Sequence, residues 1–78
     1  MPYIAIKAFP KDDETKKAMT EKINQALIDV LNCPPEVISI SFEEIQPADW
    51  EEKVIKADIE PKMDKMMILS GKRTDKMA

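Results

Sequence analysis

Pro2 is the residue of this sequence that most directly suggests chemistry. The chain has no histidine, so proton transfer near neutral pH falls to a carboxylate, a lysine, a tyrosine or the chain's own amine. A small second residue favours removal of Met1, which would give Pro2 a free secondary amine. Burial in an apolar pocket would lower the pKa of that amine, because burial disfavours its charged form. Pro2 could then take a proton from a carbon next to a carbonyl, although proline is also common at strand starts.

Other site-forming motifs are absent from the sequence. Gly71 is the single glycine, which excludes a glycine-rich nucleotide cradle. Cys33 is the single cysteine, so the chain has neither an internal disulfide nor a cysteine–histidine zinc site. We therefore predict that the protein uses no metal and no cofactor.

The charge pattern narrows the partners and the compartment. The formal net charge is −3, and the 12 basic residues are scattered among acidic ones, which disfavours nucleic acid. No apolar run approaches the length of a membrane span, and residues 1–13 lack the pattern of an export signal. An unpaired cysteine suits a reducing compartment. We predict a cytoplasmic protein with neither a nucleic-acid nor a membrane partner.

Two alternating segments flank one amphipathic segment in the first half of the chain. Residues 3–9 and 37–45 alternate with period two and predict strands, each with one clearly apolar face. Between them, a helix is expected to begin at Asp12 or Asp13 and to stop at 32–35, where two prolines follow. The spacing of its apolar residues indicates one helical stripe: Met19, Ile23, Ala26, Leu27, Val30 and Leu31. These elements form a β-α-β unit, whose strands are parallel if they are neighbours.

The second half of the chain predicts two short helices. Pro47 suits a first helical turn, so one helix is expected from there to about Lys56. Pro61 would break a continuous helix and open another over about residues 60–69, which Ser70-Gly71 would end. The tail, residues 72–78, is expected to be mobile. We take residues 1–78 as a single α/β (α+β) domain.

Two strands cannot form a stable sheet alone, and 78 residues bury little surface. Two copies of the β-α-β unit would give a four-stranded sheet with helices on one face. The C-terminal helices of a partner would cover the other face, which is lined by Tyr3, Ala5, Ser39 and Ser41. We therefore predict a homodimer or a multiple of dimers.

Three segments carry a resemblance to a known family: PYIAIK at 2–7, VISIS at 37–41 and IQPADW at 45–50. With them, the chain resembles the 4-oxalocrotonate tautomerase superfamily over nearly its whole length. It is most similar to the short dimeric bacterial members, which include phenylpyruvate-type tautomerases. The resemblance implies a β-α-β subunit, pairing into a four-stranded sheet, and an amino-terminal proline that acts as general base.

The resemblance assigns site residues one by one. Pro2 matches the catalytic proline. Lys11 stands near the position of a substrate-binding arginine, and Trp50 near a pocket-lining aromatic residue. Ser39 stands where better-known members have an arginine that binds a carboxylate, a bidentate task that serine cannot perform. Arg73, the sole arginine, could reach over a partner's pocket.

The implied activity is interconversion of the enol and keto forms of a 2-keto acid. Loss of the arginine at position 39 favours a phenylpyruvate-like substrate over a dicarboxylate. Lys11, Ser39 with nearby backbone amides, or Arg73 would steady the enolate oxygen. Two alternatives stay open. The chain could be a hydratase or dehalogenase of the same superfamily, for which Glu43 is the available carboxylate, or a non-catalytic dimeric binding module.

Overall fold

The computed structural model describes residues 1–74. The chain divides into two compact units, residues 1–46 and 47–78, and each is described by itself. No helix within the described range is long and apolar enough to span a membrane.

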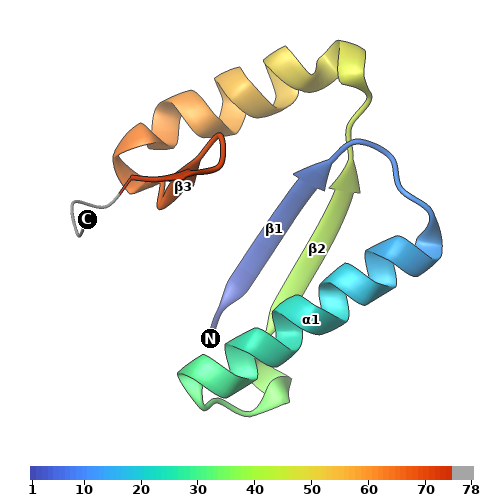
Figure 1. The fold of residues 1–78 in the computed structure, drawn as a ribbon, viewed down its shortest axis with the longest axis vertical. Helices are drawn as coiled ribbons and strands as arrows, with labels where there is room; N and C mark the ends of the chain where they lie inside the picture. Colours follow the sequence, from blue (N-terminus) through green and yellow to red (C-terminus); the bar gives the residue numbers. More distant parts are fainter. Residues whose placement is uncertain (75–78) are drawn as a thin grey trace. The chain divides into compact units, whose positions relative to one another are not determined.

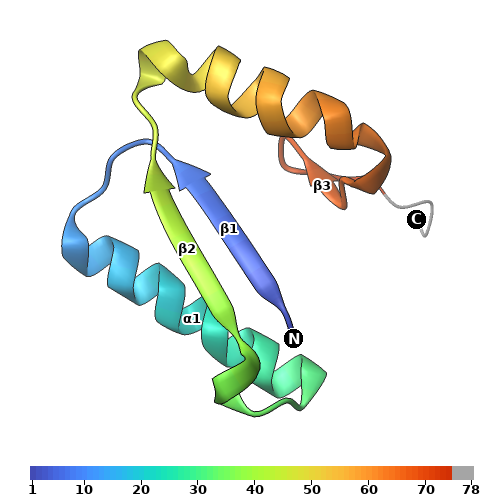
Figure 2. The ribbon, with the colours of Figure 1, turned by 180° about the vertical axis from the view of Figure 1, so that it is seen from behind.

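The first unit is the predicted β-α-β motif. Strand β1 (Tyr3–Ala8) pairs in parallel with β2 (Ser39–Glu44), and helix α1 (Asp13–Leu31) connects them across one face (Figures 1 and 2). A short 3-10 turn, η1 (Pro35–Val37), leads into β2. The register places Tyr3 opposite Ser39 and Ala8 opposite Glu44, so both strands begin at one end of the sheet and finish at the other.

The ends of α1 follow the sequence prediction. Asp12 is the N-cap residue, with an extended backbone, and its carboxylate accepts a 2.5 Å hydrogen bond from the Thr15 hydroxyl. Asn32 ends the helix in the left-handed conformation, with φ 55°, and its N–H donates to the Ile28 carbonyl at 2.9 Å. Asparagine tolerates this conformation better than most residues, which explains the stop at this position.

The apolar stripe of α1 differs in part from the prediction. Met19, Ile23 and Leu27 are half-buried, as expected, but Val30 and Leu31 are 82% and 53% exposed. Ala26 is exposed too, whereas Ile28 is half-buried.

The hydrophobic core of a single copy is thin. Among the described residues, only Ile45 and Val54 are buried hydrophobic side chains, at 3% and 6% exposure. Tyr3, at 68% exposure, and Ala5, Ser39 and Ser41 line the face of the sheet opposite α1 and are exposed. The single copy therefore leaves open the face that the sequence analysis expected a partner to cover.

The second unit is helical at first and ends in a hairpin. It contains η2 (Pro47–Asp49, a 3-10 turn), η3 (Glu51–Ile59, a π-helix), and η4 (Glu60–Lys65, 3-10). Strands β3 (Ile68–Leu69) and β4 (Lys72–Arg73) follow and pair antiparallel.

The predictions for this second unit hold in part. The helical residues begin at Pro47, as expected, and extend past Lys56 to Ile59. Pro61 lies in the first turn of a new helical segment, η4, as expected. The expected helix over residues 60–69 ends at Lys65, because residues 68–69 pair with 72–73 instead. Ser70 and Gly71, with φ of 51° and 83°, form the hairpin turn, which positive φ at both central positions favours. Lys72 and Arg73, the first residues of the expected mobile tail, belong to β4, and residues 75–78 lie outside the described part.

Candidate active site

Pro2 lies just before β1 and is held by the sheet. The main-chain N–H of Ser39 donates a hydrogen bond to the Pro2 carbonyl oxygen at 3.2 Å. Pro2 is half-buried, although it is only the second residue of the chain. The structure therefore brings two predicted site residues, Pro2 and Ser39, to the same end of the sheet and fixes one to the other through the backbone.

The neighbouring side chains on the open face are polar. Tyr3 and Ser41, on adjacent strands, share a hydrogen bond of 3.2 Å between their hydroxyl groups. Side chains at every second position of a strand point to one face, so Ser39 lies on this face as well. The Ser39 side chain is exposed and is the nearest predicted hydrogen-bond donor to Pro2 along the register.

Lys11 lies at the other end of the sheet. It lies in the loop that follows Ala8, the last residue of β1. Its main-chain N–H donates to Glu44, the last residue of β2, at 3.1 Å. The six residues of β1 separate Pro2 from this end, which corresponds to about 20 Å at the usual rise of a strand. Lys11 and Pro2 of one copy therefore do not belong to the same site.

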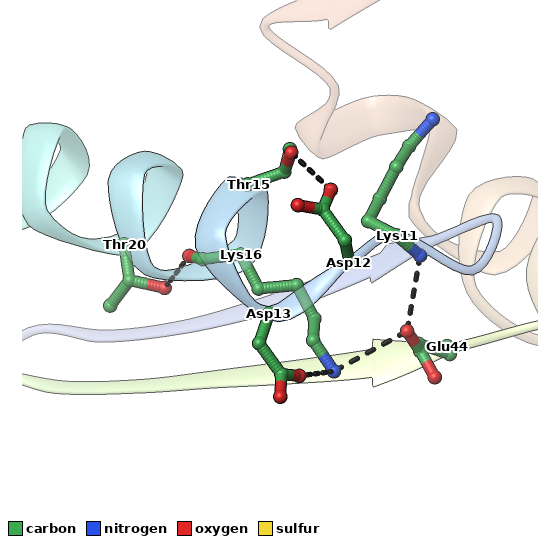
Figure 3. A network of polar contacts seen from close by, with 7 residues as sticks. All are labelled: Lys11, Asp12, Asp13, Thr15, Lys16, Thr20 and Glu44. Atoms are coloured by element: carbon green, nitrogen blue, oxygen red, sulfur yellow. Dashed lines mark hydrogen bonds and ion pairs between the residues drawn. The ribbon is translucent and has the colours of Figure 1, made fainter.

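Glu44 is the centre of a polar cluster that sequence analysis did not single out (Figure 3). Its Oε2 accepts the hydrogen bond from Lys11 N and lies 3.3 Å from Lys16 Nζ. Lys16 also pairs with Asp13 at 3.6 Å, and its ammonium lies 6.0 Å from the centre of the Phe42 ring. A signal existed in the sequence: Glu44 continues the alternation of Ile40 and Phe42 on the helix-facing side, where the helix can bring a basic side chain beside it.

Two carboxylates in this region have a lowered pKa. The Lys11 N–H, and then the Lys16 ammonium, favour the charged form of Glu44 and lower its pKa from its ordinary value. The hydrogen bond from the Thr15 hydroxyl does the same for Asp12. Both carboxylates therefore stay ionised to a lower pH than an ordinary aspartate or glutamate.

Trp50 and Arg73 lie in the second unit. Trp50 is half-buried and is the N-cap residue of η3, and Arg73 is an exposed residue of β4. Their parts in substrate binding remain predictions.

Two hollows of the first unit lie along α1 and β2. One of about 380 Å³ is lined by Lys16, Lys17, Thr20, Glu21 and Phe42, between α1 and β2. Another of about 240 Å³ is lined by Thr20, Glu21, Asn24, Ile38 and Ile40. Within residues 1–74, no three His, Cys, Asp or Glu side chains are grouped to hold a metal ion.

Comparison with known proteins decides the family. Residues 2–54 match the protein family described as "Tautomerase enzyme". This chain belongs to the tautomerase family. It is 38% identical over 73 residues to a Tautomerase PptA of Shigella sonnei, and 33% identical to one of Enterobacter sp. strain 638. Each alignment covers 91% of this chain and 96% of the relative. The β-α-β fold agrees with the family, as the sequence predicted.

Proposed function

We propose that this tautomerase interconverts the enol and keto forms of a 2-keto acid, with Pro2 as general base after removal of Met1. The family match, which begins at Pro2, is the observation that carries the proposal. The position of Pro2 supports it, because the hydrogen bond from Ser39 holds the residue at a defined place. General bases need such fixed geometry to reach a substrate proton.

The proposed reaction moves one proton between two atoms of the substrate. The Pro2 nitrogen takes the proton of the enol hydroxyl, and the electrons of the broken O–H bond form the carbonyl. The electrons of the C=C bond then take a proton from the Pro2 ammonium to form the new C–H bond, which regenerates the amine. The reverse direction starts at the α-carbon and passes through an enolate, whose oxygen needs a hydrogen-bond donor or a cation. The mechanism requires no cofactor.

A partner subunit would complete the site. In a twofold dimer that joins the sheets edge to edge, strands from the two copies run antiparallel across the interface. The end of the sheet where β1 and β2 begin in one copy then lies toward the end where β1 and β2 finish in the other. This arrangement would bring Lys11 of the partner toward Pro2, which the geometry of a single copy does not allow.

The substrate class follows from position 39. Ser39 is uncharged and exposed beside Pro2, so it supplies a hydroxyl where a carboxylate-binding arginine would bind both oxygens of a second carboxylate. Lys11 or Arg73 would then serve the single carboxylate of a 2-keto acid. A phenylpyruvate-like substrate fits this charge balance better than a dicarboxylate.

The decisive experiment varies only the first residue. One preparation would be processed to leave Pro2 free, and the other to keep Met1 before it, with mass spectrometry confirming each terminus. We expect tautomerase activity with phenylpyruvate in the first preparation alone, because an acylated nitrogen cannot accept the proton. Pro2→Ala, with Met1 removed, should lose about a hundred-fold to ten-thousand-fold in kcat. Equal activity with and without Met1 would exclude Pro2 as the base.

A further inference from the structure

We propose that Glu44 is a positioning residue for substrate binding, which holds the β1–α1 loop (residues 9–12) so that the Lys11 ammonium is presented to the substrate carboxylate. This inference rests on the proposed function. It concerns a residue outside the predicted site, on a different strand from Lys11.

The contact fixes the loop at its third residue. Between Ala8 and the N-cap Asp12, the chain turns from the end of β1 to the start of α1. The Ile45 N–H donates to the Ala8 carbonyl at 2.8 Å and closes the sheet just before the loop. The Glu44 carboxylate then accepts the N–H of Lys11 at 3.1 Å, which defines the backbone position from which the lysine side chain leaves.

The Glu44 carboxylate forms its ion pair with Lys16, so the Lys11 ammonium remains available for a substrate carboxylate. The charge of Glu44 is matched by Lys16, whose Nζ lies 3.3 Å from the carboxylate and whose side chain is 28% exposed. Within the part of the chain that the structure describes, no carboxylate forms an ion pair with Lys11 Nζ. Figure 3 shows the Lys11 side chain extending away from the cluster, while its backbone nitrogen faces Glu44. The carboxylate therefore binds the backbone of Lys11 and leaves its side chain for an anionic ligand.

The ion pair between Lys16 and Glu44 is supported by further contacts of Lys16. Lys16 is held by two carboxylates, those of Asp13 and Glu44, and by the ring of Phe42 beneath it. Without Lys16, the Glu44 carboxylate would lose the ammonium that balances its charge. Thus Lys16 balances the charge of Glu44, while Glu44 fixes the backbone position from which the Lys11 side chain leaves.

Three variants separate the positioning role from a merely structural one. Glu44→Ala removes the acceptor. We expect KM for phenylpyruvate to rise about ten-fold, which is the size of effect that loss of a hydrogen bond to a charged group produces. The value of kcat should be nearly unchanged. Glu44→Gln keeps an oxygen that can accept from Lys11 N–H, and KM should stay within about three-fold of wild type. Glu52→Ala removes an exposed glutamate paired with Lys56 at 3.1 Å and serves as the matched control, with no change in KM.

Amide hydrogen exchange tests the contact without reference to activity. The Lys11 N–H should exchange faster in Glu44→Ala than in wild type, and at nearly the wild-type rate in Glu44→Gln. A Glu44→Ala protein with wild-type KM, or a Glu44→Gln protein as impaired as Glu44→Ala, would overturn the positioning role alone. A wild-type protein with free Pro2 and no tautomerase activity would instead overturn the proposed function, and this inference with it.

Discussion

The N–H of Ser39 donates a hydrogen bond to the carbonyl of Pro2, so the first residue of β2 fixes the residue that precedes β1. This bond uses only main-chain atoms. The side chain at position 39 can therefore change without loss of the contact that places Pro2. Position 39 can tune the substrate while the position of the base stays constant.

A substitution at position 39 should change which substrates are accepted. The wild-type protein should show a higher kcat/KM for phenylpyruvate-like enols than for dicarboxylate enols. Ser39→Arg supplies a bidentate cation and should raise kcat/KM for dicarboxylates by about ten-fold or more. The comparison needs both substrate classes with both proteins. Ser39→Ala is the control, and a wild-type preference for dicarboxylates would show that another cation already fills this role.

The thin core of one copy predicts a stable assembly. Ile45 and Val54 are the buried hydrophobic side chains of the described residues, whereas Tyr3 is 68% exposed on the open sheet face. A two-stranded sheet with one covered face is marginal alone. Sedimentation at micromolar concentration should therefore show a dimer or a multiple of dimers, and Tyr3→Lys on the open face should weaken it. A folded monomer at these concentrations would contradict the expectation.

The sequence predicted the first unit well because its signals are local. Strict alternation marks both strands, and Asp12 and Asn32 cap the helix at its two ends. The second unit was predicted less well. The stop at Ser70-Gly71 is equally consistent with a helix end and with a hairpin turn, and only pairing of Leu69 with Lys72 distinguishes them. Each strand of this hairpin is only two residues long, which is too short for the alternation that predicts a strand from sequence.

The candidate site was predictable in its residues but not in its geometry. Pro2 and Ser39 come together because parallel strands share their starting end, which follows from the β-α-β order. The same order places Lys11 at the far end, a consequence that the residue types alone do not reveal. The role of Glu44 depends on where α1 places Lys16, which the alternation of the strand does not specify.

Acid should weaken the contact that Glu44 makes. Its folded-state pKa is lowered, first by the Lys11 N–H and then by Lys16, so the stabilisation is present above the ordinary value and is lost as pH falls through the lowered one. The difference in Tm between wild type and Glu44→Gln should be largest near neutral pH and should shrink toward acid pH. Lys16→Met should keep most of this pH dependence, since the Lys11 N–H is the larger cause. A Tm difference that grows toward acid pH would contradict the assignment.

Mixed dimers test whether the two ends of the sheet meet across an interface. One subunit would carry Pro2→Ala with Lys11 intact, and the other Lys11→Ala with Pro2 intact, with different tags so that the mixed species can be purified. If Lys11 serves the partner's Pro2, the mixed dimer holds one complete site and one site that lacks both residues. Its kcat per dimer should be about half that of wild type, with a wild-type KM, while both parent homodimers are impaired. If Lys11 served Pro2 of its own subunit, neither site of the mixed dimer would be complete, and mixing would restore nothing.

A pairing of Pro2→Ala with Glu44→Ala should give the same half activity as the first mixed dimer, because an intact loop from one subunit then faces an intact Pro2 from the other. Wild-type protein mixed with Pro2→Ala is the control for subunit exchange, and recovery in that mixture alone would show that Lys11 does not act across the interface.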